Sequence, residues 1–410
     1  MKRKLTRQQL EVLLGAALFQ SALLGVWINV TGVFLAEIRT ELALSVTRVS
    51  SYFTMKNIMA ALLGAIIAKA FFRSNKKVFM ACVAFSVTVA AMLLVGARYP
   101  VLWYLSAIVC SLTQGSSAIM VPYILDPWFK DKAGMATGIA MGASGLASAI
   151  TSPLSSVLIG SIGWQKALFV LCVIIWVLSA AGLWLLFKNK PDSAGGFNEE
   201  KAVQAKSIRL KSGAEKSSFK TGVFVVCSVI FVSATALMQF TQYFSIYAKG
   251  AGYALSVGAT LTSLNMIGNT AGKFLFGFLE GAIGIWNTII LAFACILAAC
   301  VCYLLFPGSL MLLYIGALLY GIVYALVNVS LSRGSIAAYG AKESQNYVGL
   351  HVSINNIGGA AYAMLIGVIY DATGNFSPIL GAGIVFCVLS IVSALILKRG
   401  KLQSKMLSGI

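Results

Sequence analysis

Residues 78–95 read VFMACVAFSVTVAAMLLV, and after the turn GARYP at 96–100 a second apolar run continues to residue 125. Neither run contains a charged residue. A helix rises 1.5 Å per residue, so about 20 apolar residues cross the hydrocarbon core of a bilayer, which is roughly 30 Å thick. Two such runs joined by a short polar turn predict a pair of antiparallel transmembrane helices.

The same pattern recurs along the whole chain. Of its 410 residues 59% are hydrophobic and only 10% are charged, whereas a soluble domain has about 25% charged residues. This composition excludes a soluble globule and a disordered chain, and predicts an all-α membrane protein that crosses the bilayer many times. Reading the apolar runs between turns and charges predicts twelve spans, near 11–36, 46–71, 77–97, 100–125, 133–159, 164–187, 221–247, 255–279, 286–306, 309–334, 345–370 and 377–397.

The spans fall into two sets of six. We predict an N-terminal half (1–187), a cytoplasmic linker (188–220), a C-terminal half (221–397) and a cytoplasmic tail (398–410), because the linker lacks apolar periodicity and is rich in Lys, Glu and Ser. A weak internal repeat accompanies this division. When Gly64 is superimposed on Gly277, Lys56 lies opposite Asn269, with Lys273 one turn further along. Repeated halves are frequent in transporters, so pseudo-symmetry between the two halves is expected.

The positive charges indicate the orientation. With the N-terminus in the cytoplasm, the inner segments carry 24 Lys and Arg residues and the outer loops carry 5. Cytoplasmic loops are enriched in these residues, so both termini are expected on the cytoplasmic side of a cell membrane, inner or plasma. The net charge of +19 is thus explained by topology and by contact with the lipid bilayer, without a nucleic-acid partner.

Two lysines, Lys56 and Lys273, fall inside predicted spans. An ammonium group near the bilayer centre costs roughly 2.5–3.5 kcal/mol, and such groups usually serve a function. No carboxylate lies at a comparable depth in either span, so an unpaired cation in a water-filled cavity that receives an anion is the hypothesis. The alternative is that both side chains snorkel to the membrane interface.

The twelve acidic residues all lie in loops, in the linker or at span ends. A carboxylate relay for protons is therefore not expected. His351, the only histidine, could titrate near neutral pH and is kept as a coupling candidate. It cannot form a multi-histidine metal site, and no nucleotide loop, metal motif or catalytic triad is present. We therefore expect no enzyme activity, cofactor or metal.

Uncharged polar side chains within the spans are candidates for the cavity lining. Their alternative role is hydrogen bonding between helices. In addition to the two lysines, the predicted substrate-binding residues are Gln20, Asn29, Gln114, Tyr123, Gln242, Tyr243, Asn269, Tyr320, Tyr324, Asn328, Asn355 and Asn356.

Three motifs carry a family resemblance. They are WFKDKAGMATGIA at 128–140, GWQKALF at 163–169 and GVIYDATG at 367–374. With these motifs the chain resembles the major facilitator superfamily along nearly its whole length, and within it the oxalate/formate antiporter and monocarboxylate transporter branch. The cytoplasmic Gly-x-x-x-Asp-Arg motif of the superfamily is degraded here to GAIIAKA at 64–70.

The resemblance implies that Lys273 contacts a substrate carboxylate from span 8. Monocarboxylate carriers pair this lysine with an Asp where this chain has Asn269, and they have a Lys near the end of span 1 where this chain has Asn29. Oxalate carriers use a second Lys in span 11, near Asn355 and Asn356 here. Lys56 in span 2 is expected to supply the second positive charge instead.

Together these features predict a monomeric secondary carrier that moves a small organic anion, a mono- or dicarboxylate, by alternating access. Anion exchange is the expected mode because no buried carboxylate is available for proton coupling. Three alternatives stay open: a drug or metabolite exporter of the same fold, a proton-coupled monocarboxylate symporter, and a membrane sensor that binds ligand without transport.

Overall fold

The computed structural model describes residues 6–129, 133–188, 221–340 and 344–407. These residues form helices joined by short turns, and no strand occurs among them. The predicted all-α fold with many spans is confirmed. The predicted linker, 188–220, lies outside the described residues except for Lys188.

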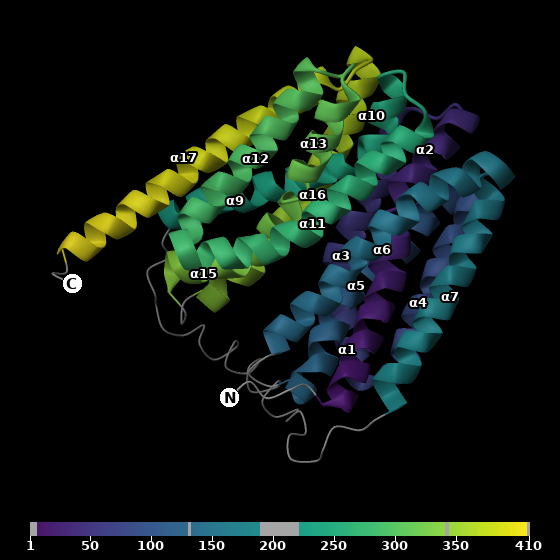
Figure 1. Cartoon of the computed structure of the whole chain (residues 1–410), viewed down its shortest axis with the longest axis horizontal. Coiled ribbons are helices and arrows are strands. Elements are labelled where there is room, and N and C mark those ends of the chain that lie inside the picture. Colours follow the sequence, from purple (N-terminus) through teal and green to yellow (C-terminus); the bar gives the residue numbers. More distant parts are fainter. Residues whose placement is uncertain (1–5, 130–132, 189–220, 341–343, 408–410) are drawn as a thin grey trace.

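The helices form two groups (Figure 1). The N-terminal group consists of α1 (Arg7–Gln20), η1 (Ser21–Ile28), α2 (Thr31–Glu41), α3 (Val46–Arg73), α4 (Lys76–Val95), α5 (Pro100–Phe129), α6 (Ala133–Ile162) and α7 (Trp164–Lys188). The C-terminal group consists of α9 (Thr221–Phe240), η5 (Thr241–Tyr243), α10 (Phe244–Gly250), α11 (Leu255–Ile283), α12 (Ile285–Leu305), α13 (Leu310–Tyr320), α14 (Val323–Ala325), η6 (Leu326–Ser330), α15 (Leu331–Tyr339), α16 (Ser344–Thr373) and α17 (Ser377–Leu407).

Each predicted span corresponds to one helix or to a run of consecutive helices. Among the described residues, nine helical segments are long and apolar enough to cross a membrane, and α3, which bends by 52° near Gly64, makes a tenth. The α11 helix is not among these ten, and it is more polar than they are because it carries Asn265, Asn269 and Lys273. The tenth predicted span is divided into α13, α14, η6 and α15. The predicted tail continues α17 as a helix to Leu407.

Local sequence explains where several helices begin. The Ser45 hydroxyl accepts a hydrogen bond from the backbone N–H of Arg48 at 3.1 Å and caps α3. Asn75 caps α4 in the same way by accepting from Lys77 at 3.0 Å. Gly284, with φ +81°, forms the turn between α11 and α12, a conformation that L side chains rarely adopt.

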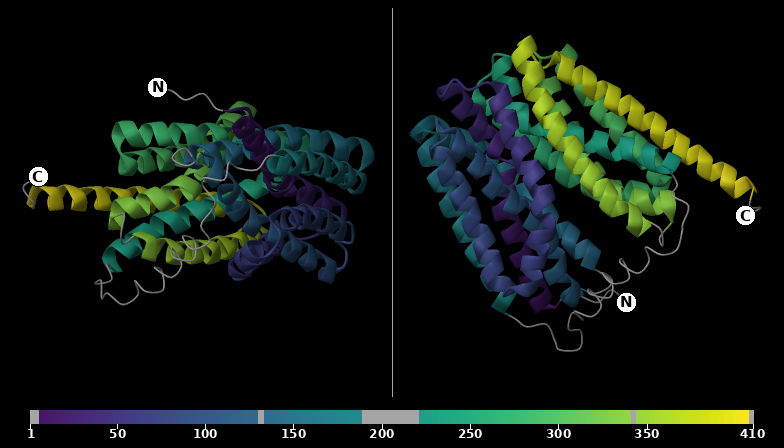
Figure 2. Two further views of the ribbon diagram at one scale, coloured as in Figure 1. Left: turned by 90° about the horizontal axis from the view of Figure 1, so that it is seen from below. Right: turned by 180° about the vertical axis from the view of Figure 1, so that it is seen from behind.

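The two groups meet along two seams, α3 against α16 and α6 against α11. We call the end of the bundle where α1 begins and α7 ends the proximal end, and the opposite end, where α2 ends, the distal end. The groups converge at the distal end and diverge toward the proximal end (Figures 1 and 2). The seams therefore define which parts of the interface are in contact.

Candidate functional site

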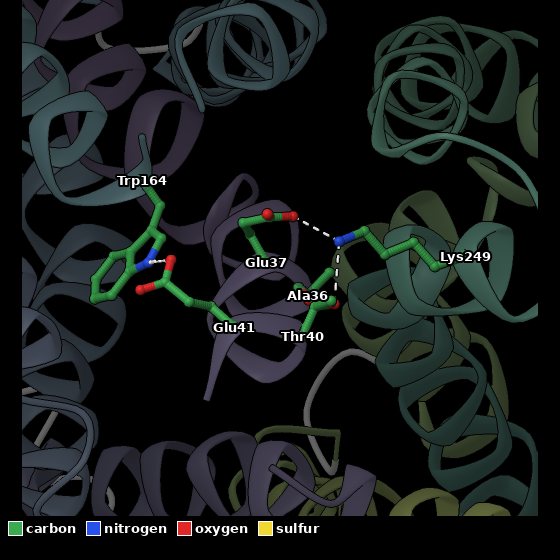
Figure 3. Close-up of polar contacts among 6 residues, drawn as sticks. All are labelled: Ala36, Glu37, Thr40, Glu41, Trp164 and Lys249. Carbon is green, nitrogen blue, oxygen red and sulfur yellow. Dashed lines mark hydrogen bonds and ion pairs between the residues drawn. The ribbon is translucent and has the colours of Figure 1, made fainter. Parts of the chain in front are cut away.

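An ion pair joins the two groups at the distal end. The Lys249 ammonium on α10 donates to the Glu37 carboxylate on α2 at 2.5 Å and to the Thr40 hydroxyl at 3.1 Å (Figure 3). Glu41, at the end of α2, accepts a hydrogen bond from the Trp164 indole at 2.6 Å, which fixes this end of the helix within its own group. The distal end of α2 is thus held from both sides.

The distal part of the α3–α16 seam is also closed. The Asp371 carboxylate accepts hydrogen bonds from the backbone N–H groups of Val46 at 2.8 Å and Thr47 at 2.7 Å. A carboxylate at a helix N-terminus also interacts favourably with the helix dipole. At Gly367 a Cβ atom would lie 2.6 Å from the Thr47 Cα, so only glycine permits this approach. The Tyr243 hydroxyl adds a hydrogen bond to Ser50 at 2.8 Å.

Hydrogen bonds between the groups continue to the middle of both seams and end there. On the α3–α16 side Thr54 donates to the Ala360 carbonyl at 3.1 Å. Next to it, α3 and α9 are joined by Asn57, which donates to the Gln239 carbonyl oxygen at 3.1 Å. On the α6–α11 side the last bond runs from the Thr270 hydroxyl to the Gly142 carbonyl at 3.3 Å.

Closer to the proximal end, no hydrogen bond or ion pair joins two described residues whose contacts are resolved across the two groups. The glycines report the same change. A Cβ atom added at Gly145 would lie 3.1 Å from the Met266 carbonyl oxygen across the seam, whereas one added at Gly134 or Gly138 would meet no atom within 4 Å. Against α11, the helix α6 is therefore closely packed at Gly145 and open at Gly138 and Gly134.

Both intramembrane lysines lie where these bonds end. Lys56 precedes Asn57, and Lys273 follows Thr270 by one turn. Lys56 is ten residues from Val46 at the distal end of α3, and Lys273 is ten residues from Ile283 at the proximal end of α11, or about 15 Å in each case at the rise of a helix. Lys56 is 4% exposed and its Nζ lies 5.3 Å from the centroid of the Phe53 ring. Lys273 is half-buried.

Neither lysine has a carboxylate within ion-pairing distance among the described residues. The described carboxylates all lie near helix ends, and most have other partners: Glu11 with Arg7 and Lys188, Glu37 with Lys249, Glu280 with Arg333, Glu41 with Trp164, and Asp371 with the start of α3. The ammonium groups of the buried Lys56 and the half-buried Lys273 are thus left without a neutralising charge in the part of the chain that the structure describes. No group of His, Cys, Asp and Glu residues that could hold a metal occurs there either.

Amide side chains also occur in the middle of the seams, where the hydrogen bonds between the two groups end. Gln114 on α5 donates to the Asn57 carbonyl oxygen at 3.4 Å, so Gln114, Asn57 and Gln239 form a chain. Asn355 on α16 is buried, and Asn269 is buried on the face of α11 that meets Gly145. Asn57 and Gln239 were not among the residues predicted from sequence. Their one signal is the position of Asn57 beside Lys56.

Several predicted residues make their contacts elsewhere, inside one group or in the distal part of a seam. Tyr320 donates to the Leu237 carbonyl at 2.9 Å, and Tyr324 shares a hydrogen bond with Thr241 at 3.0 Å, both inside the C-terminal group. Tyr243 belongs to the distal seam, and Tyr123 packs on Phe71 and Phe72.

The other predicted polar residues are distributed over α1, η5, α16 and the turn after η1. Gln20 is fully buried, and neither its side-chain nitrogen nor its oxygen has a hydrogen-bond partner. Asn29, Gln242 and Asn356 are half-buried. The side chain of Asn328 lies outside the described residues. The roles of these residues in substrate binding stay predictions.

His351 is fully buried in an aromatic cluster. Its Nε2 lies 3.0 Å from the Tyr339 hydroxyl and its Nδ1 lies 3.3 Å from the Ser228 hydroxyl, while Phe224 stacks on the ring at 4.7 Å. Both ring nitrogens are therefore engaged with hydroxyl groups, one helical turn before Asn355. A coupling role of His351 stays a prediction.

Comparison with known proteins identifies the class. Residues 17–361 match the family model of the Major Facilitator Superfamily, and the chain belongs to this family. It is a multi-pass membrane protein and a secondary transporter that works by alternating access, and this class is a transporter rather than an enzyme. No curated protein matches the sequence.

Solved structures support the fold. A mutant of the nucleoside transporter NupG superposes with a TM-score of 0.72 at 13% identity, covering 96% of this chain and 99% of that one. A bacterial homolog of the human lysosomal transporter Spinster, in an inward-facing and unoccupied conformation, gives a TM-score of 0.66 at 15% identity, covering 98% and 99%. Such low identities show the fold alone. The narrower resemblance to the oxalate/formate and monocarboxylate branch stays a prediction.

Proposed function

We propose that this transporter moves a small organic anion, a mono- or dicarboxylate, and that Lys56 and Lys273 hold its charge. One observation carries the proposal: two ammonium groups lie in the interior of their helices, each beside the last hydrogen bond of its seam, and the described residues provide no carboxylate to neutralise them. Because burying an unpaired cation is costly, a bound anion stabilises this arrangement. The anion supplies the negative charge that the described residues near the lysines do not.

The open end of the seams gives the direction of access. From the distribution of Lys and Arg we place the proximal end in the cytoplasm of a cell membrane. The conformation is then open to the cytoplasm and closed to the outside. With no carboxylate beside the lysines to carry a proton, we propose that one anion is exchanged for another and that a monomer is the functional unit.

The amide groups favour a second candidate, a neutral polar solute. Amides donate and accept hydrogen bonds without requiring charge, and the structural neighbour NupG is described as a nucleoside transporter. A nucleoside that protects the protein against thermal unfolding, when no carboxylate does, would select this candidate. Protection by lipophilic cations alone would select a drug exporter.

Uptake into proteoliposomes tests the proposal. A panel of labelled carboxylates is offered to vesicles preloaded with the same anion, using the wild-type protein, Lys273→Gln and Lys56→Gln. We expect each substitution to lower the initial rate at least about tenfold, because a hydrogen-bonded charge pair with the substrate is lost. Lys77→Gln, at the exposed start of α4, is the matched control and should transport normally. Full transport by Lys273→Gln would refute the proposal.

A further inference from the structure

The three amides at the centre of the seams form a head-to-tail chain. Gln114 donates to Asn57 at 3.4 Å, and Asn57 donates to Gln239 at 3.1 Å. Each amide has a carbonyl acceptor and an NH₂ donor, so the direction of the chain leaves the carbonyl free at the Gln114 end and the NH₂ group at the Gln239 end. The Gln114 carbonyl oxygen is buried and has no hydrogen-bond partner.

A second buried carbonyl lies close to the other end of this chain. A Cβ atom at Gly359 would lie 3.0 Å from the Gln239 Nε2, and Asn355 is one helical turn before Gly359 on the same face of α16. The Asn355 side-chain oxygen is also buried without a partner. Buried polar groups are nearly always hydrogen-bonded. The unpaired carbonyls at Gln114 and Asn355 are therefore available to a ligand that brings hydrogen-bond donors.

We propose that the chain of Gln114, Asn57 and Gln239 selects anions that also carry hydroxyl groups. The inference rests on the proposed function, because Lys56 and Lys273 are taken to hold the carboxylate. A ligand hydroxyl donates its hydrogen to the free carbonyl of Asn355 while its oxygen accepts from the Gln239 NH₂ group, or it donates to the free carbonyl of Gln114 at the other end of the chain. An anion without a hydroxyl group leaves both carbonyls unpaired and binds less tightly.

Matched ligands test the inference on the purified wild-type protein. Thermal unfolding is followed with propionate, lactate and 2-methoxypropionate. At C2, propionate has no oxygen substituent, lactate has a hydroxyl group that can donate a hydrogen bond, and 2-methoxypropionate has an ether oxygen that can only accept one. Succinate with malate, and hexanoate with gluconate, extend the test to larger anions. Sites built to bond a substrate hydroxyl reject analogues that lack it. In at least one set, we expect the hydroxylated anion to give the same stabilisation as the unsubstituted anion at a concentration at least about tenfold lower.

The two proposals fail in different ways. Equal stabilisation by all members of each set would overturn this inference and leave the anion transporter intact. Stabilisation by no carboxylate at all would overturn both.

A variant connects the preference to the amides. Asn57→Leu keeps the branched shape of the side chain and removes the middle of the amide chain, so the preference for hydroxylated anions should fall to about one while unsubstituted anions still bind through the lysines. Asn287→Leu, at the start of α12 and bonded to Ile283 in the same helix, is the control and should keep the preference. Gln114→Leu serves if Asn57→Leu does not fold. An unchanged preference in either amide variant would contradict the assignment.

Discussion

The distal and proximal parts of the seams are built from similar helices rich in small residues, but among the described residues hydrogen bonds join the two groups only in the distal part and the middle. Gly367 and Gly145 lie against atoms of the other group, whereas Gly134 and Gly138 face no atom within 4 Å. A carrier with alternating access needs both parts to be able to close. The difference therefore describes one state of an alternating pair, with the two lysines at the boundary between closed and open.

The closed part is held by several weak contacts. Lys249 and Glu37 are 22% and 27% exposed, and ion pairs near solvent contribute only about 0–1 kcal/mol. Hydrogen bonds between helices in membranes average about 0.6 kcal/mol. No single contact locks the distal end, so a ligand that binds one state more tightly can shift the equilibrium between the states.

The largest expected effect comes from filling a distal glycine. Gly367→Leu places a side chain where the Thr47 backbone lies, so the distal seam cannot close and transport should fall more than about tenfold, as expected when a close-packed contact is overfilled. Spin labels at Arg98 and Gly308 for the distal end, and at Lys77 and Gly281 for the proximal end, should show the first pair farther apart than in the wild type. Cys82, the exposed native cysteine, is replaced by serine beforehand.

Gly138→Leu tests the open proximal end of the seam. The structure has space there, so the distal-closed state should be retained and the closure of the proximal end should be blocked. The label pairs should keep their wild-type distances while transport is lost. An increase in the distal distance would mean that Gly138 acts on the distal seam, against this account.

A smaller effect is expected from Asp371→Ala. This change removes two hydrogen bonds from the first turn of α3, and losing a helix cap costs about 1 kcal/mol. The distal-closed fraction should fall by about fivefold relative to the open fraction, measured with the same distal labels. Asp126→Ala, at an exposed carboxylate near the end of α5, is the control and should leave the distances unchanged.

The ion pair is expected to contribute less. Lys249→Gln should weaken distal closure by about 0–1 kcal/mol, and the effect should shrink as salt increases because exposed charges are screened. The exchange Glu37→Lys with Lys249→Glu should restore closure. If the single and the exchanged variants behave alike at all salt concentrations, the pair does not stabilise the distal end.

The smallest effect is expected at the middle of the α6–α11 seam. Thr270→Val removes one hydrogen bond to the Gly142 carbonyl, worth about 0.6 kcal/mol in a membrane. The distal-closed fraction should change by less than about threefold. A change as large as that of Gly367→Leu would show that this bond controls the conformation.

The fold could be predicted well from sequence because apolar runs report membrane crossing directly. The π-helix at η1 and the breaks between α13 and α15 could not be predicted. The break after α13 coincides with a close contact: a Cβ atom added at Gly321 would lie 2.6 Å from the Asn269 backbone nitrogen. Such a contact between helices leaves no local signal in the sequence.

The candidate site was only partly accessible from sequence. Lys56 and Lys273 are conspicuous as charges in apolar runs. Asn57 and Gln239 are separated by 182 residues, and an amide in a span does not reveal whether its partner lies in its own group or across a seam. Tyr320 was predicted to line the cavity, yet it donates to a carbonyl inside the C-terminal group, because sequence gives the type of a side chain but not the direction in which it points.

Anion binding is proposed to depend most on the two unneutralised lysines. Equilibrium binding of the carboxylate that most stabilises the wild type should be measured by calorimetry for the wild type, Lys56→Gln, Lys273→Gln and the double variant, at low and at high salt. We predict that each single change weakens binding at least about tenfold, or 1.4 kcal/mol, and that the double variant does not bind. Unchanged affinity in a folded double variant would contradict the claim that these ammonium groups receive the substrate.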